Sequence, residues 1–240
     1  MAKTGTTGSL FGPNHFGQGS SPLLSDSDET YAQEFLHFVG NTNQKSSLIE
    51  HLMAKVIPTC RSHNTYLDIG AGEGTITSAI SPTFQQTIAI EPNEVFARML
   101  NLRGIYTHTT KFEDWRPIVD ADFVLLSHVS YYFAVEQYRS VGARISRCMA
   151  DMGVLCVAVQ DESSPFCVKN EEDPGFLEYL RSRPEFQAVS DNVVASTVCC
   201  ELPDMQRIAM LFSEALGCSN VKLQTVMDCS QRVVAFQYRD

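Results

Sequence analysis

The residues best suited to chemistry are two carboxylates on either side of a glycine cluster. Asp68 stands two residues before Gly70, and Gly72 and Gly74 follow, so that three glycines fall within five positions. The residues just before Gly70 are typical of the end of a buried parallel strand, and those after Gly74 follow a helical pattern. A strand, a glycine-rich turn and a helix N-terminus together form a cradle for a nucleotide cofactor. Glycine is needed because a Cβ atom would keep the backbone away from the ligand.

The second carboxylate, Glu91, ends the next apolar run, about 20 residues past the glycines, where an acid at a strand end binds ribose hydroxyls. The glycine pattern is neither the six-residue dinucleotide fingerprint nor a Walker loop, which requires Gly-Lys-Ser/Thr. A plain strand-to-helix turn with a surface acid is the alternative interpretation. The motif, its spacing and its context together favour the cofactor cradle.

Strands and helices are predicted to alternate through the middle of the chain, which indicates a parallel sheet with helices on both faces. An unbroken apolar run such as Val154–Val159 is typical of a strand buried on both sides. The predicted strands cover 65–69, 86–91, 105–109, 122–127 and 154–159, and the predicted helices cover 74–81, 93–102 and 134–150.

After residue 160 the rhythm changes, and the predicted elements are helices at 174–182 and 204–216, a possible strand at 192–200, and two closing strands at 220–227 and 231–238. The two closing strands are close enough along the chain to pair antiparallel.

The chain divides into a tail and one domain. Residues 1–27 are rich in Gly, Ser, Thr and Pro and are expected to be a flexible tail. Residues 28–240 are expected to form the domain: a helical cap for the substrate at 28–60, a cofactor-binding half at 64–160, and a substrate-side part with the closing strands at 161–240. In the cap, a first helix carries Tyr31, Phe35 and Phe38 on one face, and a second helix covers 44–56.

Composition narrows the partners and the compartment. The formal net charge is −10 and the isoelectric point is about 5.0, which disfavours nucleic acid and favours a cationic small molecule. No apolar run is long enough to span a bilayer, and the N-terminus lacks a signal-peptide pattern. The eight cysteines form no CxxC pair and no zinc spacing with histidine, so we expect reduced thiols in a cytoplasmic protein and no metal. We expect a monomer, because the sequence shows no long apolar stripe that would be exposed.

Ligands of such sheets bind beyond the carboxyl ends of the strands, so the residues after each strand are the candidates. After the fourth strand come Ser127, His128, Tyr131 and Tyr132. His128 could be a general base with a pKa near working pH, or could only shape the pocket. The two tyrosines could stack on a substrate ring or embrace a cation, or could simply pack at a helix N-terminus.

The segments D-I-G-A-G-E-G and I-E-P resemble the first two motifs of class I S-adenosylmethionine-dependent methyltransferases. That resemblance implies a Rossmann-like fold with a mainly parallel seven-stranded sheet, whose last strand is antiparallel, and S-adenosyl-L-methionine as cofactor, with S-adenosyl-L-homocysteine as product. The residues implied to contact the cofactor are Asp68, Gly70, Ala71, Gly72, Glu91, Pro92, Thr110, Phe112 and Ser127. Of these, Asp68 would hold the loop or the cofactor's amino end, Glu91 the ribose, and Phe112 and Thr110 the adenine.

The aromatic first helix and the paired tyrosines further resemble histamine N-methyltransferase and its relatives. The resemblance implies that Tyr31, Phe35, Tyr131 and Tyr132 wall an amine pocket. The sequence departs from that family at two substrate contacts: it has His128 where the family has glutamine, and Gln44 where the family has glutamate. The predicted substrate-binding set is therefore Tyr31, Phe35, Gln44, His128, Tyr131 and Tyr132, with His128, Tyr131 and Tyr132 also predicted to be catalytic.

The predicted reaction is methyl transfer to a nitrogen of a small amine or N-heterocycle. An amine nucleophile needs little acid–base help, but it must be unprotonated and aligned with the methyl–sulfur axis. A metal-free O-methyltransferase of small molecules, a protein or RNA methyltransferase, and a non-catalytic binding module are the alternatives. The absence of an Asn/Asp-Pro-Pro-Tyr segment after the fourth strand disfavours nucleobase or glutamine amides as substrates.

Overall fold

The computed structural model describes residues 27–116, 119–167, 175–201, 203–208 and 226–239. The predicted flexible tail therefore lies outside the described residues, except for Ser27, and so does most of the predicted helix at 204–216. None of the helices in the described parts of the chain is long and apolar enough to cross a membrane. None of the seven cysteines in these ranges is joined in a disulfide.

A seven-stranded sheet runs through the domain in the order β3-β2-β1-β4-β5-β9-β6. Every neighbouring pair is parallel except the two pairs made by β9, which is antiparallel to both β5 and β6. This confirms the predicted fold class, including the antiparallel last strand. The strands are β1 Thr65–Ile69, β2 Gln86–Ile90, β3 Tyr106–His108, β4 Ala121–Ser127, β5 Met149–Gln160, β6 Phe186–Val194 and β9 Gln231–Tyr238, and a separate two-stranded sheet pairs β7 Thr197–Cys199 with β8 Val226–Asp228.

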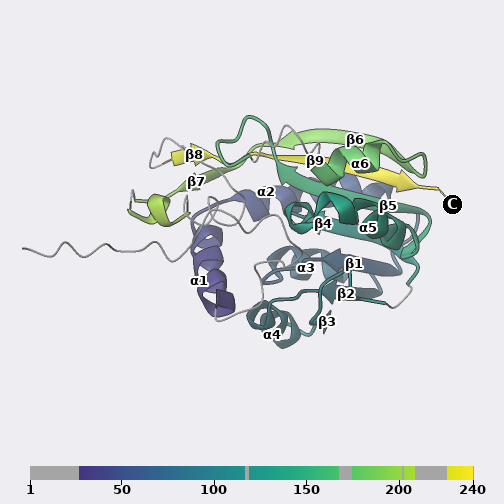
Figure 1. Cartoon of the computed structure of the whole chain (residues 1–240), viewed down its shortest axis with the longest axis horizontal. Coiled ribbons are helices and arrows are strands. Elements are labelled where there is room, and N and C mark those ends of the chain that lie inside the picture. The colour runs from purple at the N-terminus through teal and green to yellow at the C-terminus, as the bar shows by residue number, and fades with distance from the viewer. Residues whose placement is uncertain (1–26, 117–118, 168–174, 202, 209–225, 240) are drawn as a thin grey trace, which may run out of the picture.

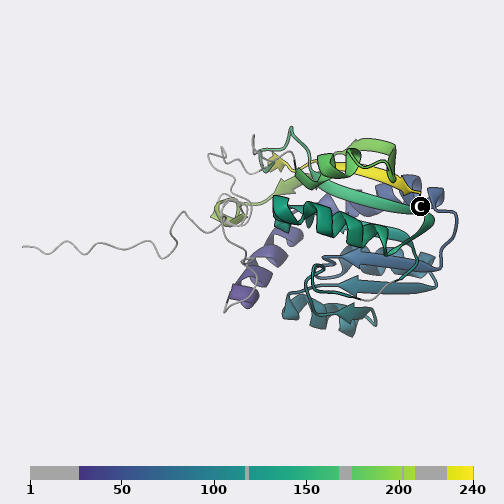
Figure 2. The ribbon, with the colours of Figure 1, turned by 45° about the vertical axis from the view of Figure 1, so that its right-hand side comes forward.

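The helices cover both faces of the large sheet, and one lies beyond its end. They are α1 Ser27–Gly40, α2 Gln44–His51, α3 Thr75–Ile80, α4 Glu94–Leu102, α5 Tyr138–Ser146 and α6 Gly175–Arg181, with a π-helical turn at Leu52–Val56 and short 3₁₀ turns at Ile57–Thr59, Ser81–Thr83, Ser130–Tyr132 and Val135–Gln137. Residues 203–208, within the predicted helix 204–216 or next to it, are helical as well. Two views of the ribbon place α1 beyond the arrowheads of β1 and β2, at the carboxyl ends of the parallel strands (Figure 1, Figure 2). The N-terminal helix is thus placed to cap the ligand-binding edge.

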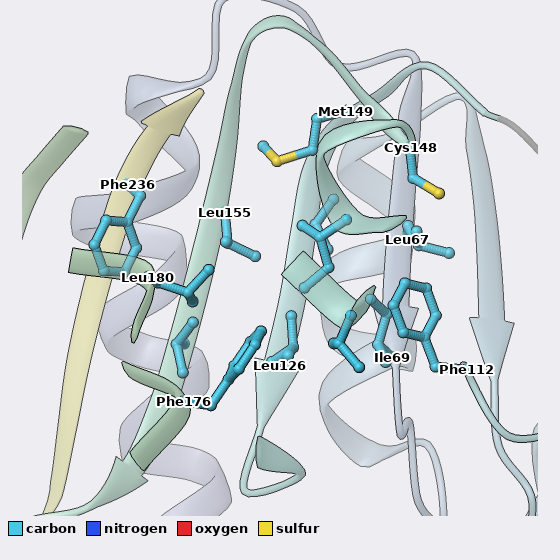
Figure 3. Close-up of a cluster of buried hydrophobic side chains, with 14 of the residues drawn as sticks. Leu67, Ile69, Phe112, Leu126, Cys148, Met149, Leu155, Phe176, Leu180 and Phe236 are labelled. Carbon is cyan, nitrogen blue, oxygen red and sulfur yellow. The ribbon is translucent and has the colours of Figure 1, made fainter. Parts of the chain in front are cut away.

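Successive side chains of the central strands point to opposite faces of the sheet and pack into two hydrophobic cores, one on each face. On one face, Leu67 and Ile69 of β1 join the cluster that α5 and α6 cover, which Figure 3 shows in close-up. On the other face, Tyr66 joins a cluster built from α2, the turn after it, and α3. Because both faces of the central strands are buried, the strands read as continuous apolar runs, which is why they could be recognised from the sequence.

The segment before β5 was predicted wrongly. The predicted helix 134–150 ends at Ser146, and β5 begins at Met149 instead of Val154. The pairing of β4 with β5 shifts register between Ala121 and Phe123. Gly153 resembles a helix-ending glycine in the sequence, but it lies in this irregular strand, where a Cβ would come within 2.8 Å of the Ala121 carbonyl oxygen. A glycine inside a strand often marks such a close approach of two backbones.

The pairing of the closing strands also differs from the prediction. Strand β9 pairs with β5 and β6, whereas β8, the described end of the predicted strand 220–227, pairs with β7. The possible strand 192–200 is in fact two strands, since β6 ends at Val194 and β7 begins at Thr197. Closeness along the chain favours a hairpin, but here the long partner strands of the main sheet have more apolar surface to bury.

Candidate active site

A cavity opens at the carboxyl ends of the parallel strands, under α1 and the start of α2. It is lined by Tyr31, Phe35, Phe38, Gln44, Lys45, Leu48, Asp68, Gly70, Ala71, Gly72, Ile76, Glu91, Pro92, Asn93, Phe96, Leu125, Ser127, His128, Val129, Tyr131, Tyr132, Gln160 and Gln231. All the predicted site residues are in this set except Thr110 and Phe112. The cavity therefore brings together side chains from segments as distant in sequence as α1 and β9.

The glycine loop turns between β1 and α3 with three residues in the left-handed region, at φ values of 73° for Gly70, 59° for Gly72 and 84° for Gly74. The backbone N–H groups of Gly70 and Ala71 donate to the carbonyl oxygen of Ile90, which ties the loop to the end of β2. A Cβ on Gly72 would be in ordinary van der Waals contact with Phe35 at 3.8 Å and with Lys45 at 3.9 Å, so the bare backbone of this glycine leaves room for one more atom beside them. The loop presents bare backbone to the cavity, as a cofactor cradle requires.

Glu91 lies just after β2 and is only 6% exposed. Its Oε2 accepts a hydrogen bond from the Gly72 backbone N–H at 2.8 Å, and its Oε1 accepts one from the Asn93 backbone N–H at 2.8 Å. Each carboxylate oxygen can accept a further donor, so two ligand hydroxyls can be accommodated. Burial raises the pKa of Glu91 to about 7, although the two backbone hydrogen bonds act in the opposite direction.

Asp68 ties the end of β1 to α3. Its Oδ2 accepts hydrogen bonds from the Tyr66 hydroxyl at 2.6 Å and from the Thr77 hydroxyl at 2.7 Å. Burial raises the pKa of Asp68 to about 6, against the effect of these two hydrogen bonds. The side chain therefore holds the glycine loop in place while it also lines the cavity.

His128 follows β4 and adopts φ 56°, an uncommon conformation for a residue other than glycine. Its Nε2 lies 3.0 Å from Oε1 of Gln231. Burial lowers the pKa of His128 to about 4 and the charge of Lys45 acts the same way, while the hydrogen bond with Gln231 opposes them. The prediction of a pKa near working pH is therefore wrong, because the ring is too poorly solvated to hold a positive charge. At neutral pH the imidazole is uncharged and a weak base.

Aromatic side chains close the cavity. The hydroxyl groups of Tyr31 on α1 and Tyr132 after β4 are hydrogen-bonded to each other at 2.8 Å. The ring of Tyr31 stacks on Phe35 at 5.9 Å between centroids, and Phe35 in turn contacts Phe96 of α4 at 5.4 Å. The Tyr131 hydroxyl accepts a hydrogen bond from the backbone N–H of Gln160. The first helix is thus fixed across the cavity by both apolar packing and a phenol pair.

Two predicted residues lie away from this cavity. Phe112 is 3% exposed and packs in the core beside Ile69 (Figure 3), with its ring 6.2 Å from that of Trp115. The hydroxyl of Thr110 bonds to the backbone oxygen of Lys111. Neither side chain lines the described cavity, and their contact with the adenine stays a prediction.

Sequence reasoning missed several cavity residues. Gln160 comes directly after the apolar run of β5, so the strand-end rule that identified Glu91 could also have found it. Gln231 begins an antiparallel strand, so its place at the same edge follows only from the topology. Lys45 makes an ion pair with Glu73, and its Nζ lies 5.0 Å above the Phe35 ring centroid. No sequence signal connects these two residues, which come from different parts of the fold.

The glycine loop yields a stability prediction with an internal control. We expect Gly70→Ala to lower the free energy of unfolding by about 3 kcal/mol, because alanine is strained at positive φ and its Cβ would overlap Val129. A Cβ at position 70 would lie 2.5 Å from Val129 Cγ2, whereas Gly104, at φ 77°, has nothing within 4 Å. Gly104→Ala should therefore cost only the backbone strain, about 1 kcal/mol. Equal losses in urea denaturation would contradict the close packing at Gly70.

The comparisons with known proteins agree with this geometry. A family model described as "Methyltransferase domain" matches residues 40–223, and the chain belongs to this family. No curated protein matches the chain. The chain is an S-adenosylmethionine-dependent methyltransferase, and the glycine cradle and the remaining acceptor capacity of Glu91 fit that cofactor.

Solved structures with this fold have low sequence identity. The N-methyltransferase NodS from Bradyrhizobium japonicum WM9, in complex with S-adenosyl-L-homocysteine, is 12% identical with a TM-score of 0.51, over 92% of this chain and 94% of that one. A TehB-like SAM-dependent methyltransferase from Corynebacterium glutamicum ATCC 13032 Kitasato is 15% identical with a TM-score of 0.55, over 88% of this chain and 98% of that one. A SAM-dependent methyltransferase from Archaeoglobus fulgidus is 12% identical with a TM-score of 0.54, over 80% and 94%.

The raised pKa of Glu91 predicts how cofactor binding depends on pH. Ribose hydroxyls donate to the ionised carboxylate, and the pKa of about 7 means that this form becomes dominant only above neutral pH. We expect the affinity for S-adenosylhomocysteine to rise about tenfold from pH 6 to pH 8 in calorimetric titrations. Glu91→Gln is the control, because its weaker residual binding should lack this increase. An equal rise in the variant would assign the titration to another group.

Proposed function

We propose that this enzyme transfers the methyl group of S-adenosylmethionine to a nitrogen of a small amine or N-heterocycle. The observation that carries the proposal is the single cavity that joins the glycine loop to an aromatic compartment under α1. The hydrogen bond between Tyr31 and Tyr132 joins two walls of this compartment, and a partly enclosed space of this kind suits a small molecule better than a protein or RNA chain.

The cofactor would be held by the loop and by the strand ends. The residues that we assign to it are Asp68, Gly70, Ala71, Gly72, Glu91, Pro92 and Ser127, all of which line the cavity. S-adenosylmethionine, when bound, supplies an electrophilic methyl group. The protein's share of the work is to bind the nucleophile in line with that group and to keep water out.

The substrate would occupy the aromatic compartment. Tyr31, Phe35, Tyr131 and Tyr132 offer ring faces, and His128 and Gln44 offer polar atoms. An amine there must be uncharged to attack, and a partly desolvated aromatic site disfavours the ammonium form. The pocket likeness to histamine N-methyltransferase and its relatives, together with the composition, also leads us to propose a cytoplasmic monomer.

Methyl-labelled S-adenosylmethionine tests this function. The purified protein is incubated with imidazoles, aromatic amines, alkylamines and phenols, and separately with protein and RNA from a cell extract. We expect label in the nitrogen compounds and none with Glu91→Ala. Label in phenols alone would favour the metal-free O-methyltransferase, and label in protein or RNA would favour a macromolecular substrate. Cofactor binding without transfer to any acceptor would contradict the proposal.

A further inference from the structure

The environment of His128 determines which of its ring nitrogens carries the hydrogen. Gln231, at the start of β9, is fully buried and bridges two groups with its amide. Its Nε2 donates to the backbone oxygen of Gln44 at 2.8 Å, and its Oε1 lies 3.0 Å from His128 Nε2. A backbone carbonyl can only accept, so the amide nitrogen must face Gln44 and the amide oxygen must face the imidazole. Only an N–H at Nε2 can complete that contact.

The other ring nitrogen, Nδ1, then carries the lone pair. His128 lines the cavity, and its Nδ1 makes no hydrogen bond to the described residues. The backbone of His128 is fixed beside the cavity, because its N–H donates to the Ala158 oxygen at 2.8 Å while φ is held at 56°. A non-glycine residue in this region at a ligand site suggests a functional constraint on the side chain.

The charges around the ring favour a neutral partner. Lys45 of α2 is the charged group that acts on the imidazole, Tyr131 lies 6.2 Å away between ring centroids, and the Gln231 amide is neutral. An alkylammonium has a pKa near that of lysine, about 10.4, and a ring that is uncharged at neutral pH gives it little help in losing its proton. A weakly basic nitrogen compound reaches the cavity already neutral.

We propose that Gln231 is a positioning residue that fixes His128 as the Nε2–H tautomer, so that Nδ1 accepts a hydrogen bond from a neutral N–H group of the substrate. The substrate class is therefore N–H heterocycles and aromatic amines in preference to alkylammonium ions. This rests on the proposed function for the identity of the ligand, whereas the tautomer itself is a property of the protein alone.

The tautomer can be measured directly by ¹⁵N NMR of the histidine side chains in the ligand-free protein. We expect His128 to show an unprotonated Nδ1 and a protonated Nε2 from pH 6 to 8. Gln231→Leu should give averaged signals of both tautomers. Gln231→Glu, which places a carboxylate opposite Nε2–H, should keep the tautomer and raise the His128 pKa by more than about one unit. An Nδ1–H tautomer or averaged signals in the wild type would overturn the proposal, even if neither variant folds.

The ligand side is tested with imidazole and 1-methylimidazole, which lacks the N–H donor, in the presence of S-adenosylhomocysteine at pH 8. The wild type should prefer imidazole by about fivefold, the worth of one hydrogen bond. His128→Asn places an amide near the position of Nδ1 and tolerates positive φ, so it should keep a preference that His128→Gln loses. Equal binding of the two ligands by the wild type would overturn the acceptor role. Failure of S-adenosylhomocysteine to bind would instead refute the proposed function and leave the NMR result standing.

Discussion

Glu91→Ala is expected to weaken S-adenosylhomocysteine binding by at least about 100-fold. The carboxylate would lose two hydrogen bonds to ribose hydroxyls, and hydrogen bonds to a charged group are worth about 1.5–3 kcal/mol each. The variant also removes the acceptor of the Gly72 backbone N–H, which holds the glycine loop at 2.8 Å from Glu91. Isothermal titration calorimetry of both proteins measures the change.

Two further variants show whether the loss of affinity in Glu91→Ala is specific to this carboxylate. Glu94→Ala removes an exposed carboxylate three residues along, which forms an ion pair with Arg98 on the same helix. This variant should bind the ligand like the wild type. Glu91→Gln keeps the shape but offers one acceptor in place of two, so its affinity should fall between those of the wild type and Glu91→Ala. If Glu91→Ala bound the ligand as tightly as Glu94→Ala, Glu91 would not hold the cofactor.

Lys45→Met is expected to destabilise the fold by about 3 kcal/mol. The ion pair it removes is buried, with 17% of the Lys45 side chain and 3% of the Glu73 side chain exposed, so Glu73 would be left as an uncompensated charge. Burial alone would raise the pKa of Glu73, but Lys45 and nearby hydrogen bonds bring it below the ordinary value of 4.5. Urea denaturation at pH 7 gives the free-energy difference.

The pH dependence of unfolding shows whether the charge of Glu73 causes this loss of stability. A carboxyl group with a lowered pKa stabilises the fold above the unfolded-state value of about 4.5 and loses that contribution as the pH falls through its folded-state pKa. The gap between wild type and Lys45→Met should therefore narrow in acid. Lys45→Met combined with Glu73→Gln should recover part of the loss, and Lys55→Met, at an exposed position, should cost little. A gap that is independent of pH and unchanged in the double variant would contradict the charge explanation.

The cofactor half of the site could be predicted because it depends on local sequence. The glycines and the acid at the end of the next strand lie within about 25 residues of each other in the sequence. The rule that ligands bind beyond the carboxyl ends of parallel strands then places both at one edge of the sheet. The aromatic face of α1 could be predicted from helical spacing alone. The contact of Tyr31 with Tyr132 could not, because it depends on how the chain folds. The number of strands and the antiparallel direction of the last strand were implied by a family resemblance and not by the residues themselves, and the order of the strands was not predicted.

The remainder depended on contacts between distant segments. Gln231 reaches His128 because β9 lies between β5 and β6, whereas closeness along the chain had pointed to residues 220–227 as the partner of this strand. The lowered pKa of His128 comes from burial and from Lys45, and neither can be deduced from the residues around position 128. Phe112 follows a strand as a ligand contact would, but its ring fills the core under α5. Position after a strand therefore identifies candidates without telling which side chains turn inward.

The most direct test of the central claim is a calorimetric titration of the wild-type protein with S-adenosylhomocysteine at pH 8. The cavity at the strand ends predicts one site per chain with micromolar affinity, competed by S-adenosylmethionine. If the folded wild-type protein shows no heat of binding and no shift in its thermal unfolding with this ligand, the cavity is not a cofactor site. The proposed methyl transfer would then have no basis in this structure.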